Sequence, residues 1–100
     1  MIARTWRGET ATRDADEYVA YLETTGLPQY RATPGNRGAY LLRRANGDRT
    51  EFLTVSFWND LGAIRGFAGA DIDVAVFYPE DDRFLTARDL VAFHYEVASP

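Results

Sequence analysis

The sequence predicts a single α+β domain over residues 1–100, in which strand-like and helix-like segments alternate. Three observations carry this prediction. Two strand-forming runs flank Asn46-Gly47, two segments show the three- and four-residue apolar spacing of helices, and alternating apolar runs lie near both ends. One of the central runs is apolar on both faces, so the sheet that contains it needs cover on both sides.

The first element is a strand over residues 2–7, which we expect Gly8 to end. The helix that follows begins at Asp14 as N-cap, with Glu17 three residues later in the pattern of a capping box. We expect it to stop at Gly26, and a loop to lead from there to the central strands. One face of this helix is apolar at helical spacing, through Ala15, Tyr18, Val19 and Leu22.

The central element is a β-hairpin from Asn36 to Trp58, with arms over residues 38–44 and 50–58. Asn46-Gly47 between the arms predicts a type I′ turn, because that turn needs positive φ at both central residues. The second arm carries apolar side chains on both faces, with Leu53, Val55 and Phe57 on one and Phe52 and Trp58 on the other.

A shorter helix follows the hairpin, capped by Asn59 or Asp60 and ended by Gly69. It carries Leu61, Ile64, Phe67 and Ala68 on one side. Gly62 and Gly66 within it each cost roughly 1 kcal/mol relative to alanine, so this helix depends on packing.

The remaining segment contains one ambiguous stretch and one strand. Val74–Tyr78 is either a short strand or a buried connection into a helical turn opened by Pro79. We expect the acidic residues 80–82 to form a solvated helix start. Residues 90–97 predict the last strand, with two opposite faces: Val91, Phe93, Tyr95 and Val97 on one, and Ala92, His94 and Glu96 on the other.

The order strand, helix, strand, strand, helix, strand is that of the ferredoxin-like βαββαβ plan, a four-stranded antiparallel sheet with both helices on one face. Two helices cannot cover both faces of such a sheet. We therefore expect a homodimer in which the uncovered faces of two copies pack sheet against sheet.

Composition excludes several classes of function. The net charge of −4 and the absence of a basic stripe argue against a nucleic-acid partner. Without cysteine there is no disulfide or zinc-thiolate site, and with one histidine we expect no metal site. No segment has the pattern of a signal peptide or the length of a membrane span, so a cytoplasmic protein without a membrane partner is expected.

Three features are candidates for chemistry. His94 has an ordinary pKa near neutrality, so it is either a general base or a core or interface histidine satisfied by a hydrogen bond. The many tyrosines and tryptophans either line a pocket for a flat aromatic ligand or simply pack the core. Arg4 either anchors a phenolate or carboxylate, or forms an ion pair with Glu51 or Glu96.

Four short motifs resemble a known family across essentially the whole chain: Trp6-Arg7-Gly8, Phe57-Trp58 with residues 61–69, Tyr78-Pro79-Glu80-Asp81, and His94-Tyr95-Glu96-Val97. Together they resemble the antibiotic biosynthesis monooxygenase (ABM) domain superfamily of dimeric α/β barrels. The resemblance implies a homodimer with a pocket in each protomer between the sheet and its helices.

The resemblance also implies a function. Some relatives oxidise anthrone-like polyketides or quinols with O₂ and no metal or flavin, some degrade haem, and others bind ligands without catalysis. We therefore expect a cofactor-independent monooxygenase acting on an aromatic polyketide or quinol-type substrate, with a non-enzymatic ligand-binding dimer as the alternative and haem binding as a third option. The implied base is His94, and the implied pocket residues are Arg4, Trp6, Trp58, Phe67 and Tyr78. The haem degraders carry an iron-ligating histidine in a helical segment ahead of the last strand, where this chain has none.

Overall fold

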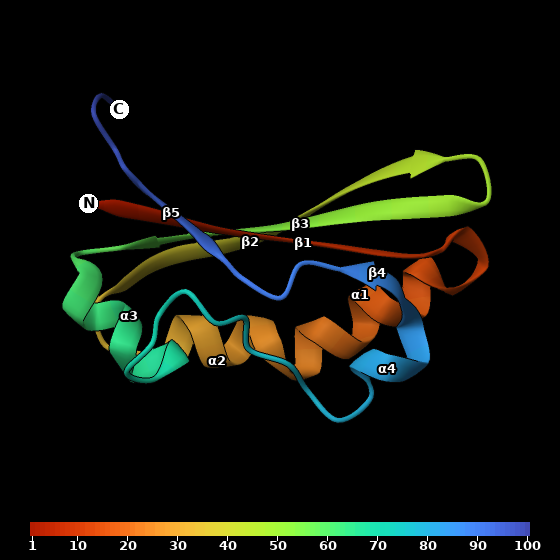
Figure 1. The fold of residues 1–100 in the computed structure, drawn as a ribbon, viewed down its shortest axis with the longest axis horizontal. Helices are drawn as coiled ribbons and strands as arrows, with labels where there is room; N and C mark the ends of the chain where they lie inside the picture. The colour runs from red at the N-terminus through yellow and green to blue at the C-terminus, as the bar shows by residue number, and fades with distance from the viewer.

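The computed structural model describes residues 1–100 as one antiparallel sheet with every helix on the same face (Figure 1). The strands are β1 (Ile2–Ala11), β2 (Asn36–Asn46), β3 (Arg49–Trp58), β4 (Leu85–Arg88) and β5 (Phe93–Glu96). The helices are α1 (Ala15–Thr24), α2 (Gly26–Ala32), α3 (Leu61–Ala68) and α4 (Asp81–Phe84), and a 3₁₀ turn, η1 (Thr12–Asp14), precedes α1. The order β2-β3-β1, with β4 and β5 on the free edge of β1, confirms the ferredoxin-like plan.

The predicted hairpin is present, but its turn lies one residue further along the chain. Asn46 pairs with Arg49, so the two loop residues are Gly47 and Asp48. Gly47 has a φ of 64°, whereas no residue other than glycine has a positive φ. A type I′ turn is therefore wrong, and glycine at the first central position is the arrangement of a type II′ turn.

Strand β1 does not end at Gly8, as the sequence had suggested, but continues to Ala11. The indole of Trp6 folds over Gly8, and a Cβ atom there would lie 2.4 Å from Cη2 of Trp6. Glycine at this position therefore makes room for the tryptophan ring rather than breaking the strand.

The predicted loop after α1 is also wrong, because residues 26–32 form helix α2. Leu27 and Tyr30 are buried against the sheet, and Pro28 is tolerated because it lies in the first helical turn, where its missing N–H has no partner to lose. The capping box does not form, since the Asp14 side chain makes no cap hydrogen bond. By contrast, α3 begins as predicted at Asp60, whose Oδ1 accepts from the backbone N–H of Ala63 at 2.8 Å, and it ends at Gly69.

The predicted last strand, residues 90–97, is shortened to β5, and β4, which the sequence did not predict, precedes it. The pairing of β1 changes register by two residues between β4 and β5, and residues 90–92 leave the sheet edge. There they pair instead with the irregular segment after α3. The Ala92 N–H donates to the Asp73 carbonyl at 2.8 Å, and the Ala75 N–H donates to the Leu90 carbonyl at 3.0 Å. Residues 72–78, hereafter the wall segment, are thereby held beside the helix-facing side of β1 as a connection that leads into α4.

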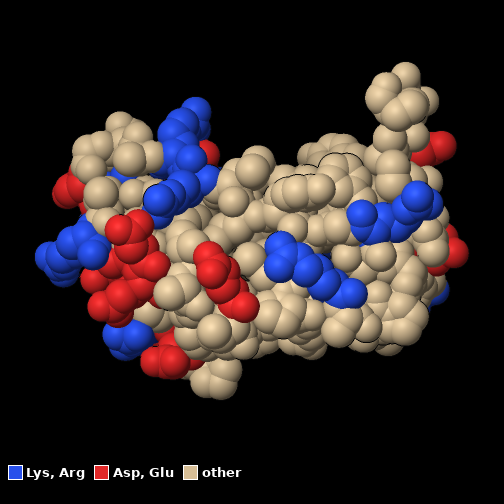
Figure 2. Space-filling model, turned by 180° about the vertical axis from the view of Figure 1, so that it is seen from behind, with Lys and Arg blue, Asp and Glu red and all other residues tan.

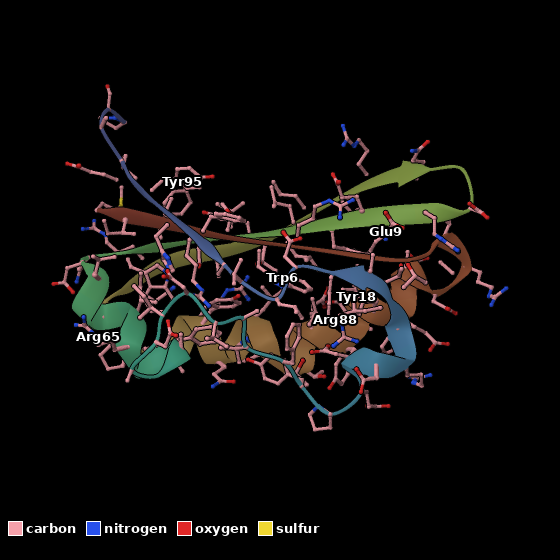
Figure 3. The ribbon with its side chains drawn as sticks, viewed as in Figure 1. Trp6, Glu9, Tyr18, Arg65, Arg88 and Tyr95 are labelled. Atoms are coloured by element: carbon pink, nitrogen blue, oxygen red, sulfur yellow. The ribbon has the colours of Figure 1, made fainter.

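The two faces of the sheet differ in character. On the helix side, Phe52 and Trp58 are completely buried, as the alternation predicted. The opposite face, hereafter the open sheet face, carries mostly apolar side chains that pair directly across strands: Tyr40 with Val55, Leu42 with Leu53, Phe93 with Thr5, and Tyr95 with Ala3. The first member of each pair is exposed and the second is half-buried. Figure 3 shows Tyr95 on this side and the side chains of Trp6 and Tyr18 between the sheet and the helices.

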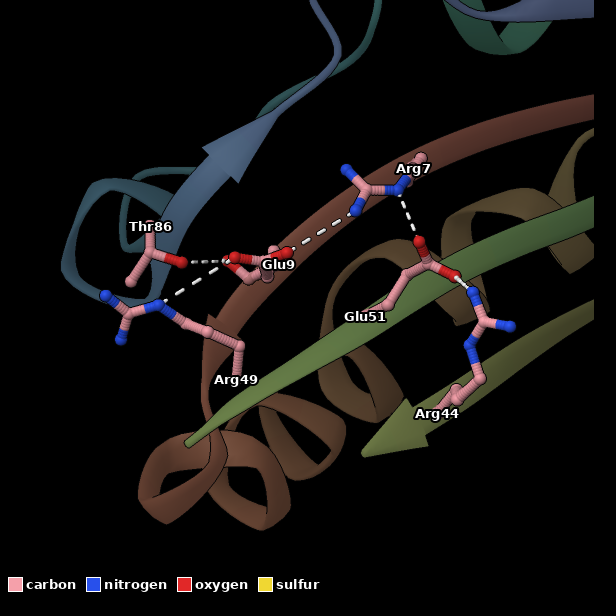
Figure 4. Close-up of polar contacts among 6 residues, drawn as sticks. All are labelled: Arg7, Glu9, Arg44, Arg49, Glu51 and Thr86. Atoms are coloured by element: carbon pink, nitrogen blue, oxygen red, sulfur yellow. Dashed lines mark hydrogen bonds and ion pairs between the residues drawn. The ribbon is translucent and has the colours of Figure 1, made fainter. Parts of the chain in front are cut away.

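Toward the hairpin turn the open sheet face becomes charged. Glu51 on β3 accepts from Arg7 at 2.6 Å and from Arg44 at 3.0 Å, while Glu9 lies near Arg7 and Arg49 (Figure 4). Charged side chains crowd this end of the molecule and are sparser toward its middle (Figure 2). No helix in the structure has the length and apolar character that crossing a membrane would need.

Candidate functional site

A small cavity lies between the sheet, helices α1 and α2, and the wall segment. It encloses about 30 Å³, which is room for one or two water molecules. Aromatic rings form much of its lining, through Trp6, Tyr18, Tyr30 and Tyr78. Two charged side chains also reach it, Arg4 from β1 and Asp81 from the start of α4. A mostly apolar cavity with a few converging polar groups is the usual form of a small-molecule site.

Arg4 is only 2% exposed, because it lies on the helix-facing side of β1 beneath the wall segment. Its Nη1 donates to the Ile72 carbonyl and to Nε2 of His94 at 2.8 Å, and its Nη2 donates to the Val74 carbonyl at 3.3 Å. Its Nε is buried and has no hydrogen-bond partner. Burial lowers the pKa of Arg4, but a guanidinium keeps its charge at neutral pH.

His94 lies behind Arg4 and is not among the residues that line the cavity. Because arginine can only donate, Nε2 of His94 must be the acceptor, which places the imidazole proton on Nδ1. Nδ1 lies 3.2 Å from Oδ1 of Asp73, so the proton has an acceptor there. The three side chains Asp73, His94 and Arg4 are therefore linked by hydrogen bonds. The basic nitrogen of the imidazole, Nε2, already accepts from Arg4.

Burial lowers the pKa of His94, with a further decrease from the neighbouring Arg4 charge that Asp73 only partly opposes. The folded protein therefore resists protonating this histidine, whereas the unfolded chain takes up the proton near pH 6.5. We expect the free energy of unfolding to fall as the pH drops below about 6.5 toward the folded-state pKa. Since the chain has one histidine, NMR titration of its ring should show a midpoint below 6.5.

The matched variant for this titration is His94→Gln, whose amide oxygen can still accept from Arg4 but does not titrate. The pH-dependent loss of stability described above should be smaller in this variant than in the wild type. An imidazole midpoint at or above 6.5, or the same pH dependence in both proteins, would contradict this account of His94.

The tyrosines around the cavity are uncharged donors at neutral pH. Burial raises the pKa of Tyr18, Tyr30 and Tyr78 above that of a free phenol. For Tyr30 the neighbouring Thr54 and Arg4 act in the opposite direction. The Tyr78 hydroxyl donates to Oε1 of Gln29 at 2.6 Å, which ties the wall segment to α2.

Asp81 is the site residue that the sequence did not reveal. The acidic turn was predicted to be solvated, and that is wrong for Asp81, which is 3% exposed, although Asp82 beside it is exposed. Oδ2 of Asp81 accepts from the backbone N–H of Tyr78 at 2.6 Å, while Oδ1 is buried without a partner. Burial raises the pKa of this carboxyl. The sequence signals for it were its place in the Tyr78-Pro79-Glu80-Asp81 motif and its position shortly after the apolar run of residues 74–78.

The other predicted site residues fall in two groups. Trp6 and Tyr78 line the cavity with Arg4. Trp58 and Phe67 do not line it but pack beside it: Trp58 donates to the Ser56 hydroxyl at 2.9 Å, and the ring of Phe67 stacks on Tyr30 with centroids 4.2 Å apart. The predicted pairing of Arg4 with Glu51 or Glu96 does not occur, because Arg4 lies on the helix-facing side of β1 and donates instead to Ile72, Val74 and His94. No three histidine, aspartate or glutamate side chains gather where they could hold a metal ion.

Comparison with known proteins identifies the fold. No family model matches the sequence, and no curated protein matches it significantly. Among solved structures, a Bacillus cereus protein classed with the antibiotic biosynthesis monooxygenases is 15% identical, with a TM-score of 0.70 and coverage of 100% of this chain and 94% of that one. Rv0793 from Mycobacterium tuberculosis is 17% identical, with a TM-score of 0.62 and coverage of 99% and 96%. The haem degrader MhuD from the same organism, solved with two haems in its active site, is 17% identical, with a TM-score of 0.61 and coverage of 100% and 98%.

Proposed function

We propose that this chain, which has the fold of the antibiotic biosynthesis monooxygenase superfamily, binds a small aromatic phenol or enol in its cavity and promotes oxidation of that compound by O₂. The observation that carries the proposal is the buried Nε of Arg4, which makes no hydrogen bond in the structure, although the Tyr30 hydroxyl lies near the guanidinium, and which belongs to a residue lining an aromatic cavity. A buried donor without a partner is costly, so a ligand oxygen that accepts from it gains binding energy.

The chemistry uses electrons from the substrate itself. A deprotonated quinol or anthrone is electron-rich enough to pass an electron to O₂. The protein then needs to exclude water, to hold the ring and to stabilise the oxyanion. The Arg4 guanidinium supplies a fixed positive charge for the oxyanion, and Trp6, Tyr18 and Tyr30 supply flat apolar surface for the ring.

For His94 the geometry supports a positioning role. Its Nε2 accepts from Nη1 of Arg4, which helps to fix the plane of the guanidinium beside the cavity. To act as the predicted general base, His94 would first have to release Arg4 and gain access to the substrate. We therefore assign it the task of orienting Arg4.

The cavity must enlarge before a ring can enter, since about 30 Å³ holds no more than one or two waters. The wall segment is the element that can move to enlarge the cavity, because it has only one isolated strand pairing and contains no helix. At this site the wall segment is held by the hydrogen bonds from Arg4 to Ile72 and Val74 and by the contact between Asp73 and His94. A ligand oxygen that bonds to Arg4 would compete for the donors that hold the wall segment.

A second candidate function is ligand binding without catalysis. It is favoured by the engagement of both His94 nitrogens, which leaves the predicted base unavailable. Haem ligated by histidine would require His94 to release Arg4 or Asp73, because the chain has one histidine and both of its nitrogens are engaged. Oxygen uptake separates catalysis from simple binding.

We further propose that a second copy of the chain covers the open sheet face. Tyr40, Leu42, Phe93 and Tyr95 on this face are all at least half exposed. Apolar patches of this kind on a sheet mark an interface, and a symmetric pair of copies satisfies both patches at once.

The proposal can be tested with an NMR titration followed by oxygen uptake. Hydroquinone is added without O₂ while the two indole N–H signals are recorded, since Trp6 lines the cavity and Trp58 is an internal control outside it. We expect a saturable shift of the Trp6 signal and little change at Trp58. Admitting O₂ should then give oxygen consumption above that of heat-inactivated protein.

The NMR shift and the oxygen consumption together distinguish the two candidate functions. A Trp6 shift without oxygen consumption would assign the protein to ligand binding alone for this class of compound. No saturable shift with hydroquinone, with an anthrone or with their methyl ethers would contradict the proposed site.

A further inference from the structure

We propose that Asp81 is the proton acceptor of this site, and that the ligand carries two oxygen functions on opposite sides of an aromatic ring, a free hydroxyl facing Asp81 and an acceptor oxygen facing Arg4. This inference rests on the proposed function and names its substrate class and base.

Two buried side-chain polar atoms in the chain lack a hydrogen-bond partner, Nε of Arg4 and Oδ1 of Asp81. Both belong to residues that line the same cavity. Nε of Arg4 is a donor and Oδ1 of Asp81 is an acceptor. A ligand that satisfies both must therefore present an acceptor to Arg4 and a donor to Asp81. Two such atoms beside one aromatic cavity are explained together by a ligand that accepts at one end and donates at the other.

The two residues approach the cavity from different elements. Arg4 lies in the half of β1 that pairs with β5 and contacts the ring of Phe67 on α3. Asp81 begins α4, which leads into β4, and β4 pairs with the other half of β1. Trp6 lies between these halves of β1 and also lines the cavity. A ring beside Trp6 would therefore have one edge toward each charged group.

The surroundings of Asp81 suit a base. Oδ2 is held by the Tyr78 N–H at 2.6 Å, which fixes the carboxylate and leaves Oδ1 free. Burial raises the pKa of Asp81, while the charge of Arg88 acts in the opposite direction and Asp82 adds to the rise. The other titratable groups near it, Tyr18 and Tyr78, are uncharged phenols. A buried carboxylate with a raised pKa takes a phenol proton more readily than an exposed one.

The proposed step is a simple proton transfer. The substrate O–H bond breaks, an O–H bond forms on Oδ1 of Asp81, and the electron pair stays on the substrate oxygen. The negative charge delocalises onto the ring carbons ortho and para to that oxygen, including the carbon that bears the second oxygen, and the Arg4 guanidinium beside that end of the ring stabilises the anion. His94 cannot take this proton in the present geometry, because its Nε2 already accepts from Arg4.

The test compares 4-methoxyphenol with 1,4-dimethoxybenzene, in which a methyl group replaces the proton of the free hydroxyl. Binding is followed without O₂ by the indole N–H signal of Trp6. We expect the wild type to bind the phenol at least about tenfold more tightly, the usual effect of one hydrogen bond to a charged group.

The variants are Asp81→Asn and the matched control Asp82→Asn, which removes the same charge from an exposed neighbour. Asparagine keeps an oxygen for the Tyr78 N–H but presents an amide donor in place of Oδ1. We expect Asp81→Asn to lose the preference for the phenol and Asp82→Asn to retain it. The ratio of the two dissociation constants is measured in each protein. The steric effect of the added methyl group therefore cancels when the ratios are compared between proteins.

Three results would overturn the inference, and one of them would also overturn the proposed site. Equal binding of both probes by the wild type would overturn the inference, even if Asp81→Asn failed to fold. An unchanged preference in folded Asp81→Asn would also overturn it. If neither these probes nor hydroquinone moves the Trp6 signal, the proposed site itself fails and the inference fails with it.

Discussion

Replacing Arg4 with methionine is expected to abolish the response of Trp6 to hydroquinone and to lower the free energy of unfolding by about 3 kcal/mol. Methionine fills much of the same volume but donates no hydrogen bond. The carbonyl oxygens of Ile72 and Val74 and Nε2 of His94 would then be left without their donor. Chemical denaturation measures the loss of stability, and the NMR titration measures the loss of binding.

A matched control for Arg4→Met is Arg7→Met, the same substitution on the same strand but on the open sheet face. Arg7 is partly exposed and its ion pairs are accessible to solvent, so its loss should cost much less and leave binding intact. Equal destabilisation by the two substitutions would contradict the role given to Arg4.

A double-mutant cycle with His94→Leu examines the link between the two side chains. Because removing both partners leaves neither one unsatisfied, the double variant should be more stable than the sum of the single changes predicts, by about 0.5–3 kcal/mol. Simple additivity would show that the 2.8 Å contact between Arg4 and His94 contributes nothing to stability.

The second large effect is expected on the open sheet face. Leu42→Asp should convert a dimer into a monomer of 11.3 kDa, as measured by light scattering during gel filtration. Leu42 is half exposed in the isolated chain and lies directly opposite Leu53, so the change should be tolerated by the fold. In a sheet-to-sheet dimer the new carboxylate would be buried without a partner, which costs several kcal/mol.

The matched control is Leu61→Asp, the same substitution at a leucine of similar exposure on α3, away from the open sheet face. It should leave the dimer unchanged. A wild-type mass of 11.3 kDa at all concentrations, or equal effects of the two variants, would contradict the proposed dimer interface.

Local patterns in the sequence determined the architecture. Apolar residues along 50–58 showed that both faces of this strand are apolar, and the structure buries one face and leaves the other half-buried. Asp60 and Gly69 marked the ends of α3 correctly, because capping depends on neighbouring residues. The order of elements gave the ferredoxin-like plan and the resemblance to the fold that the solved structures confirm.

Only the tertiary structure decided how the site is built. Arg4 meets Ile72 and His94 at separations of 68 and 90 residues, so no local pattern could show that His94 has its basic nitrogen occupied. The burial of Asp81 likewise depends on the wall segment and on α1, and the sequence around it is that of an exposed acidic turn. Periodicity reports which face of an element is apolar, whereas the partners of a polar atom are set by segments that only the folded chain brings together.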